Sequence, residues 1–310
     1  MSLNKSSKIL ISIEGNIGVG KSTFIELLKN KWANTGFGPC EIVLEPVDMW
    51  IGLKNSDGKN ILQTFYEDVP RWSYSFQNVA CISRMMKIEE TIRTTDSKYI
   101  FLDRSLGTDK NVFEAMLHDE GNINELEHSM YNLWCNFYHK YVNSLDEQIH
   151  IYLKASPTKC YERIVKRGRV EEKNITLDYL QNLNKYHDKW LLSDSMKSKT
   201  IVIDSESEFE SDLNIQNEMI NQIVEFLKKY DYSNKIDEIT KKFEVMNMHD
   251  ENDDENDEKE KEQEHSENDK QNQTDDENNE NDNKQENNDK QNQTEEEIDY
   301  YARAGVCNIS

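Results

Sequence analysis

The sequence predicts an α/β fold in which helices flank a parallel sheet of five strands on both sides. Three observations support this prediction. Five short apolar segments, rich in β-branched residues, alternate with segments of helical periodicity between residues 8 and 230. The first apolar segment runs directly into a glycine-rich loop that opens a helix. The composition changes sharply near residue 247, which indicates that the folded part of the chain ends before it.

The first predicted strand covers residues 9–13 and leads into the loop GNIGVGKS, which fits G-x-x-x-x-G-K-[ST] at every fixed position. Glycines let successive backbone N–H groups converge on an anion, and the helix N-terminus adds donors and partial positive charge. Lys21 can reach the β- and γ-phosphates, and Ser22 can hold Mg²⁺ through its hydroxyl. The motif predicts a nucleoside triphosphate site made of Gly15, Asn16, Ile17, Gly18, Val19, Gly20, Lys21, Ser22 and Thr23.

The second and third predicted strands both end in acidic residues. Residues 41–44 precede Glu45-Pro46, and residues 98–102 precede Asp103-Arg104-Ser105. Ligands of open parallel sheets bind outside the carboxyl ends of the strands. Glu45 is therefore either a catalytic group beside the phosphate loop or a solvated turn residue. Asp103 suits an acidic group near a metal ion, and Arg104 suits a phosphate contact.

Residues 61–93 are mostly helical in period, with an interruption at Val69-Pro70. Gln77 and Arg84 are seven residues apart and therefore share one face of this helix. Both side chains supply paired donors and are suited to read the polar edge of a ring. The alternative is an ordinary solvated helix face.

The remaining elements continue the alternation of helices and strands. Helical segments are predicted over 108–117 and 124–144, and the second carries aromatic residues that indicate a core or subunit-contact stripe. A fourth strand over 149–153 precedes a helix that starts at Ser156-Pro157 and ends in the segment KRGRVEE, residues 166–172. Arginines around a glycine between two helices indicate a mobile lid over the triphosphate, with a solvated basic helix end as the alternative. A helix over 176–192, a fifth strand over 200–204 and a helix to about 229 complete the pattern.

Composition divides the chain into a flexible N-terminus (1–7), one domain (8–232), a linker or helical extension (233–246) and a disordered Asn/Asp/Glu-rich tail (247–310). Residues 247–300 carry 23 acidic residues and 5 lysines, a net charge of −18 out of −23 for the chain. The domain itself is therefore only mildly acidic, which argues against nucleic-acid binding. The tail is either a partner-binding or solubilising appendage, whose partner is unknown, or a repeat expansion without a selected role.

Five scattered cysteines without C-x-x-C spacing indicate a reduced, cytoplasmic protein rather than a disulfide framework or a zinc site. No run of apolar residues is long enough for a membrane span. The sequence therefore predicts a cytoplasmic protein that contacts neither membrane nor nucleic acid.

Together these motifs resemble the deoxynucleoside kinase family, which includes the deoxycytidine, deoxyguanosine and deoxyadenosine kinases. The resemblance runs from about residue 8 to 230 and rests on segments in the family's order. These are the phosphate loop, E-P-V at 45–47 with Trp50, R-W-S-Y-S-F-Q at 71–77, A-C-I-S-R at 80–84, D-R-S at 103–105 and R-G-R-V-E-E at 167–172. The resemblance implies a P-loop kinase of nucleotide salvage that acts as a homodimer, with Mg²⁺ and ATP as the phosphate donor.

The resemblance also implies roles for individual residues. Glu45 is the general base for the attack of a deoxynucleoside 5′-hydroxyl on the γ-phosphorus of ATP, Arg104 positions it, and Asp103 holds hydrated Mg²⁺. The sugar 3′-hydroxyl binds Tyr66 and Glu172. The base pairs with Gln77, stacks between Trp50 and Phe76 or Phe113, and contacts Arg84 and Asp109. The phosphates bind Arg167 and Arg169.

Purine deoxynucleosides and deoxycytidine are favoured over thymidine, because thymidine-accepting relatives usually lack the pair at Arg84 and Asp109. Gly107 replaces a bulkier residue of the family and is expected to reshape the pocket beside Asp109, whereas Val79 and Ala80 leave the base preference open. Two alternatives remain. A nucleoside monophosphate or thymidylate kinase needs a basic group near Glu45, but none occurs between it and Lys54. A nucleotide-binding scaffold that acts through the tail needs neither Glu45 nor the lid arginines.

Overall fold

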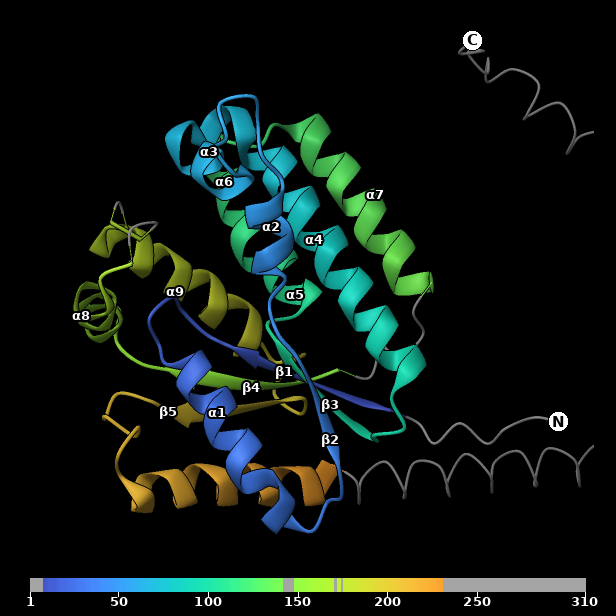
Figure 1. Cartoon of the computed structure of the whole chain (residues 1–310), viewed down its shortest axis with the longest axis vertical. Helices are drawn as coiled ribbons and strands as arrows, with labels where there is room; N and C mark the ends of the chain where they lie inside the picture. The colour runs from blue at the N-terminus through green and yellow to red at the C-terminus, as the bar shows by residue number, and fades with distance from the viewer. Residues whose placement is uncertain (1–7, 142–147, 170–171, 174, 231–310) are drawn as a thin grey trace, which may run out of the picture. The chain divides into compact units, whose positions relative to one another are not determined.

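A parallel five-stranded sheet organises the fold (Figure 1). The computed structural model describes residues 8–141, 148–169, 172–173 and 175–230, which all lie within one structural unit. The strands are β1 (Ile9–Glu14), β2 (Cys40–Val43), β3 (Tyr99–Asp103), β4 (Ile149–Lys154) and β5 (Thr200–Asp204). Their order is β2-β3-β1-β4-β5, and all neighbours pair in parallel. The central strand β1 therefore carries the phosphate loop.

Several helices begin at residues whose side chains cap them. Asn60 forms a capping box with Gln63, and Asp68, Ser156 and Thr176 accept backbone N–H bonds at the starts of three later helices. The helical elements are α1 (Lys21–Lys31), 3₁₀ helix η1 (Trp32–Thr35), α2 (Val47–Gly52), α3 (Ile61–Glu67), α4 (Val69–Thr94), α5 (Leu106–Thr108), π-helix η2 (Asp109–Glu114), α6 (Ala115–Asp119), α7 (Glu125–Tyr141), α8 (Pro157–Arg167) and α9 (Leu177–Leu191). Residues 213–230 are also helical.

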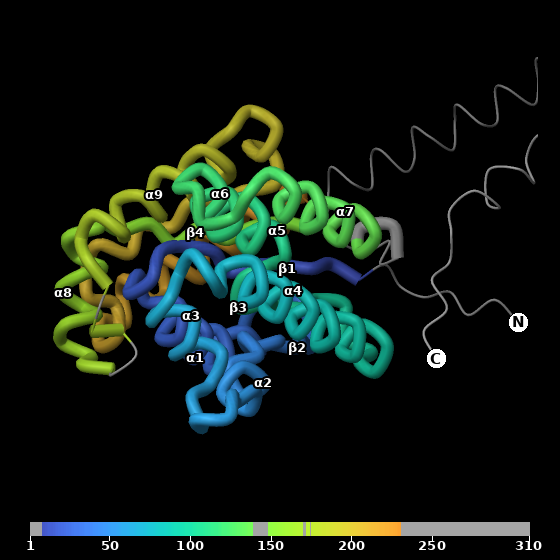
Figure 2. The backbone as a smooth tube through the Cα atoms, turned by 90° about the horizontal axis from the view of Figure 1, so that it is seen from above, coloured from blue at the N-terminus to red at the C-terminus, as the bar shows by residue number. Residues whose placement is uncertain are grey.

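The two faces of the sheet are covered by different helices, as Figures 1 and 2 show. Ile9, Ile11 and Ile13 of β1 pack in a core that includes α1 and the helix over 213–230. Leu10 points to the opposite face, where it packs with side chains of α4 and α7. Because successive side chains of a strand alternate between faces, the central strands β1, β3 and β4 are buried on both sides, whereas the edge strands β2 and β5 are partly exposed.

The structure confirms the predicted five-stranded sheet and the break near Pro70, where α3 ends and α4 begins. The segment predicted as one helix over 108–117 is instead divided into α5, η2 and α6. A six-residue π-helical stretch therefore carries Asp109 and Phe113, and such stretches often occur at functional sites. The predicted N-terminus 1–7, extension 233–246 and disordered tail 247–310 lie outside the described residues. No helix in the described part of the chain is long and apolar enough to cross a membrane.

Candidate active site

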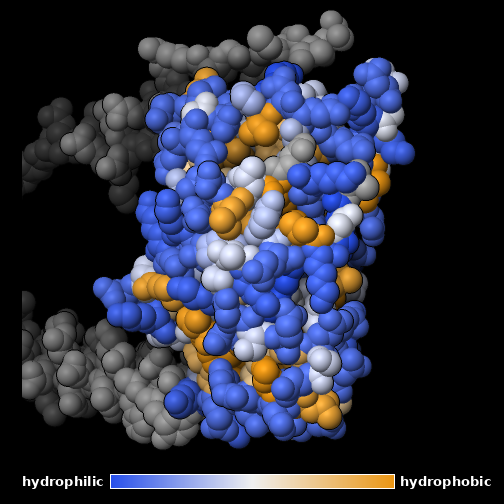
Figure 3. Space-filling view, turned by 90° about the vertical axis from the view of Figure 1, so that its left-hand side faces the viewer, coloured by the Kyte–Doolittle hydropathy of each residue, from blue (hydrophilic) through white to orange (hydrophobic). Residues whose placement is uncertain are grey.

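A cavity of about 990 Å³ opens at the carboxyl ends of the strands, between the phosphate loop, α4 and the end of α8. The molecular face that carries α8 is mainly hydrophilic, with apolar side chains in separate patches (Figure 3). The predicted site residues that line the cavity are Ile17, Gly18, Gly20, Lys21, Ser22, Thr23, Glu45, Trp50, Tyr66, Gln77, Arg84, Asp103, Arg104, Asp109, Phe113, Arg167, Arg169 and Glu172. Gly15, Asn16 and Val19 belong to the loop but not to the cavity wall.

The phosphate loop requires glycine at positions where the chain passes close to its neighbours. Gly15 and Gly18 have φ of 139° and 81°, and a Cβ on Gly18 would lie 2.4 Å from the carbonyl oxygen of Cys160 in α8. Lys21 folds back over the loop, and its Nζ donates to the carbonyls of Gly15 at 3.1 Å and Asn16 at 3.0 Å. Burial, with the nearby Arg104, lowers the pKa of Lys21 to about 7.

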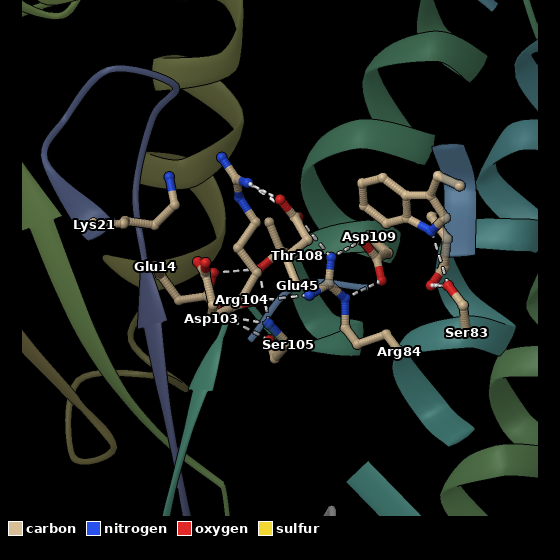
Figure 4. Close-up of polar contacts among 12 residues, drawn as sticks. Glu14, Lys21, Glu45, Ser83, Arg84, Asp103, Arg104, Ser105, Thr108 and Asp109 are labelled. Carbon is tan, nitrogen blue, oxygen red and sulfur yellow. Dashed lines mark hydrogen bonds and ion pairs between the residues drawn. The ribbon is translucent and has the colours of Figure 1, made fainter. Parts of the chain in front are cut away.

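Two arginines from different elements hold Glu45, as Figure 4 shows. Arg84 of α4 places Nη2 3.0 Å from Glu45 Oε1, and Arg104, after β3, places Nη1 3.2 Å from the same oxygen. Burial alone would raise the pKa of Glu45, but Arg104 and Arg84 lower it to about 2. Glu45 is therefore an ionised carboxylate inside the cavity rather than a solvated turn residue.

Arg84 is buried and binds three acceptors at once. Its Nε donates to Asp109 Oδ2 at 2.8 Å and its Nη1 donates to the Asp103 carbonyl at 2.7 Å, in addition to the contact with Glu45. Gln77 is also buried and lines the cavity, and its Oε1 has no hydrogen-bond partner. These positions exclude the solvated helix face that the sequence left open.

Aromatic residues form the part of the cavity wall next to Gln77. Phe76 of α4 packs edge-on against Trp50 with ring centroids 5.5 Å apart, and stacks on Phe65 at 4.8 Å. The Trp50 indole N–H donates to Ser83 Oγ at 2.9 Å, which fixes the ring. Tyr66 and Phe113 also line the cavity. Gly107, by contrast, is not part of the wall, because the Trp190 ring of α9 occupies the space where a Cβ would lie.

Of the predicted lid, residues 166–172, the structure describes all but residues 170 and 171. Arg167, the last residue of α8, makes a bidentate ion pair with Glu172, with Nη2 at 2.6 Å from Oε1 and Nε at 3.1 Å from Oε2. Arg169 Nη1 lies 3.8 Å from Glu172 Oε1. In this structure Glu172 thus binds the lid arginines.

Sequence reasoning missed several residues of the site. Arg163 of α8 donates to the Val19 carbonyl at 3.2 Å and to the Ser205 carbonyl at 2.8 Å, so it joins the phosphate loop to the segment after β5. Phe209 of that segment lies against Gly20. In the sequence, Phe209 is marked merely as a single aromatic residue among acidic ones. Glu14, the last residue of β1, is buried behind Arg104 and bonds to Ser105 and Thr108.

Comparison with known proteins agrees with this geometry. The family model for deoxynucleoside kinases matches residues 11–228. The chain belongs to the deoxynucleoside kinase family. Similar proteins are "Deoxycytidine kinase 2" of Gallus gallus, 34% identical over 70% of this chain and 89% of that protein; "Deoxycytidine kinase" of Homo sapiens, 35% identical over 61% and 77%; and "Deoxyguanosine kinase, mitochondrial" of Xenopus laevis, 30% identical over 73% and 93%.

The kinase is therefore a transferase that uses ATP to phosphorylate deoxynucleosides in nucleotide salvage. This result does not favour the two alternatives, a monophosphate kinase on the same fold and a nucleotide-binding scaffold.

Proposed function

We propose that the kinase transfers the γ-phosphate of ATP to the 5′-hydroxyl of a purine deoxynucleoside or deoxycytidine, with Glu45 as the general base. The observation that carries this proposal is the place of Glu45, which two arginines hold between the phosphate loop and the aromatic wall. ATP bound on the phosphate loop and a nucleoside bound against the aromatic wall would meet at this carboxylate. Phosphoryl transfer depends mostly on such positioning and on charge neutralisation.

Ionisation of Glu45 suits this role. A carboxylate with a pKa of about 2 is fully charged at neutral pH and accepts a hydrogen bond from the 5′-hydroxyl. The γ-phosphate adds negative charge beside Arg104 and Lys21, so it competes with Glu45 for these cations and raises its proton affinity. The base thus becomes stronger when both substrates are bound. Lys21, Arg167 and Arg169 neutralise the phosphates, and Arg104 keeps Glu45 aimed at the hydroxyl.

Mg²⁺ fits the residues between the loop and β3. Ser22 lines the cavity, and Asp103 has a buried Oδ1 without a hydrogen-bond partner. Mg²⁺ prefers oxygen ligands and usually retains waters, with one or two protein ligands and the substrate phosphates. The described residues include no cluster of three or more His, Cys, Asp or Glu arranged for a metal, which agrees with a metal that arrives with ATP. We assign Ser22 and Asp103 to this ion, whose charge screens the phosphate oxygens.

The part of the cavity beside the aromatic wall, which we assign to the nucleoside, favours bases that carry an amino group. Asp109 and Arg84 form a buried pair at 2.8 Å, and Gln77 presents an amide with an unpaired oxygen. A carboxylate and an amide oxygen accept hydrogen bonds from the exocyclic amine of adenine or cytosine, a group that thymine lacks. The aromatic wall stacks on the ring. We assign Tyr66 and Glu172, which both line the cavity, to the sugar 3′-hydroxyl, and Glu172 must then exchange part of its pairing with Arg167.

We also propose that the kinase is a homodimer through α4 and α7. These helices lie side by side (Figures 1 and 2), and α4·α7 contacts connect them. Their outer faces expose Ile82, Met86, Leu126, Met130, Leu133, Trp134 and Phe137. Exposed apolar side chains gathered on two neighbouring helices are typical of a self-complementary interface. Light scattering of Leu133→Asp should then report a monomer.

A cytoplasmic location is inferred from the thiols. Cys81 and Cys135 are both buried in the contact between α4 and α7, and both are free. Free neighbouring thiols are typical of a reducing compartment. A fluorescent fusion of the full chain would locate the protein.

Substitution Glu45→Gln tests the mechanism. We expect turnover to fall by roughly 10²–10⁴-fold while ATP binding persists, because the amide keeps the shape but cannot take the proton. Radiolabelled ATP and the four deoxynucleosides give both turnover and base preference. Asp48→Asn, an exposed carboxylate three residues further on, is the matched control. Unchanged turnover in Glu45→Gln would remove Glu45 from the mechanism, and phosphorylation of thymidine alone would refute the base preference.

A further inference from the structure

Arg104 has an unusual backbone conformation for an arginine. Its φ is 65°, and it is the sole non-glycine with positive φ among the described residues. This conformation costs about 1–2 kcal/mol for an L-residue with a Cβ and persists only where surrounding contacts determine it. This backbone conformation sets the direction in which the Arg104 side chain extends from the end of β3, and therefore whether its Nη1 reaches Glu45. Something in the structure must hold the turn that follows β3.

Glu14 provides the contacts that hold this turn (Figure 4). Its side chain is completely buried at the end of β1. Oε1 accepts from the Ser105 backbone N–H at 3.1 Å and from the Ser105 hydroxyl at 2.7 Å, while Oε2 accepts from the Thr108 hydroxyl. The carboxylate therefore binds the residue directly after Arg104, and another residue one helical turn later.

Glu14 also lies directly before Gly15, the first residue of the phosphate loop. The Arg104 N–H bonds to the Ile13 carbonyl at 3.2 Å, so β1 contacts the turn on both sides of Arg104. The same two residues of β1 thus fix the start of the phosphate loop and the turn that carries Arg104.

We propose that Glu14 is a positioning residue for phosphoryl transfer, which holds Arg104 in its left-handed conformation so that its guanidinium orients Glu45 relative to the phosphate loop. This inference rests on the proposed function of Glu45. Hydrogen bonds to the charged carboxylate are stronger than those to a neutral amide. Glutamine at this position can accept from Ser105 with its oxygen, but it turns an NH₂ toward Thr108. That NH₂ can only donate to the Thr108 hydroxyl, so the hydrogen bond reverses its direction and loses the charge of the carboxylate, and the turn is held to β1 less strongly.

The test combines Glu14→Gln with Arg104→Gln in a double-mutant cycle. We expect Glu14→Gln to lower kcat by about 10- to 100-fold, the effect of a displacement of about 1 Å in a catalytic group, with the KM for the nucleoside nearly unchanged. In the Arg104→Gln background the same substitution should change kcat less than twofold, because the group through which it acts is absent. Asp188→Asn is the matched control, a carboxylate bonded to Tyr152 and Lys154 away from the cavity.

Two outcomes of the cycle overturn the proposal. One is a loss in Glu14→Gln no greater than that of Asp188→Asn, and the other is the same fold-loss with and without Arg104. Should Glu14→Gln fold poorly, Thr108→Val removes one donor at nearly constant volume. It should then lower kcat by a smaller factor that also disappears in the Arg104→Gln background, and an undiminished kcat refutes the inference.

A crystal structure of Glu14→Gln gives a readout that does not need activity. We expect Arg104 to leave positive φ and its Nη1 to separate from Glu45. Retention of both features would refute the role of Glu14 even if Glu45 were not the base. Conversely, full activity of Glu45→Gln would refute the proposed mechanism and leave this structural result standing.

Discussion

Binding of MgATP at pH 8 should bring a proton onto Lys21. Its pKa of about 7 follows from burial in the phosphate loop and from the neighbouring Arg104. With that pKa, only about a tenth of Lys21 is charged at pH 8 and about half at pH 7. Triphosphate oxygens favour the charged form and move the pKa back toward its usual range. The expected uptake is therefore about 0.9 proton per site at pH 8 and about 0.5 at pH 7.

Calorimetry measures this uptake directly. MgATP is titrated into the kinase at pH 8 in two buffers of different ionisation enthalpy, and the slope of observed against buffer enthalpy gives the number of protons. Because binding is linked to protonation, affinity should also fall about tenfold between pH 8 and pH 9.

Lys21→Arg is the control, because a guanidinium remains protonated throughout this range. It should bind MgATP without proton uptake and with little dependence on pH. A slope near zero for the wild-type kinase, equal to that of Lys21→Arg, would show that burial does not lower the pKa of this lysine.

Three further predictions concern stability. In urea unfolding, Gly18→Ala should destabilise the fold more than Gly36→Ala. Both glycines have φ of 81°, so both substitutions cost about 1–2 kcal/mol in backbone strain, but only a Cβ on Gly18 would also meet the Cys160 carbonyl. Equal losses would contradict the close approach. Arg84→Met should cost about 3–5 kcal/mol in the same assay, since Asp109 and Glu45 lose a buried partner; a loss under 1 kcal/mol would contradict this. Burial lowers the pKa of His150 to about 4, so the unfolded chain binds its proton first, and this residue alone should lower the stability by about 2 kcal/mol from pH 7 to pH 5. Thermal unfolding of His150→Gln should show a weaker fall, and an identical one would assign the effect elsewhere.

The sheet and much of the cavity wall could be predicted because their signals depend on residues that are close together in the sequence. Period and caps locate the strands and helices, and the spacing of Gln77 and Arg84 places both on the buried face of α4. The break of the predicted helix over 108–117 into a π-helical stretch has no such signal, since it depends on what Asp109 contacts in three dimensions.

Long-range partners explain the rest. Arg84 binds acceptors from three other segments, and Glu14 binds residues about 90 positions later. In the sequence Glu14 is merely the last residue of a strand. The positive φ of Arg104 likewise depends on tertiary contacts and not on its own side chain. The pairing of Glu172 with Arg167 depends on how the lid segment folds back, which a motif does not record.

The close approach of Gly18 to the Cys160 carbonyl fixes the position of α8 relative to the phosphate loop. One point of the helix touches the phosphate loop backbone, and Arg167 ends the helix seven residues later, a rise of about 10 Å. The reach of Arg167 is thus set by helix length and rotation. An inserted residue between the two would turn Arg167 by about 100° and carry its charge away from the proposed phosphate site. This interval should therefore accept exchanges of exposed side chains far more readily than changes of length.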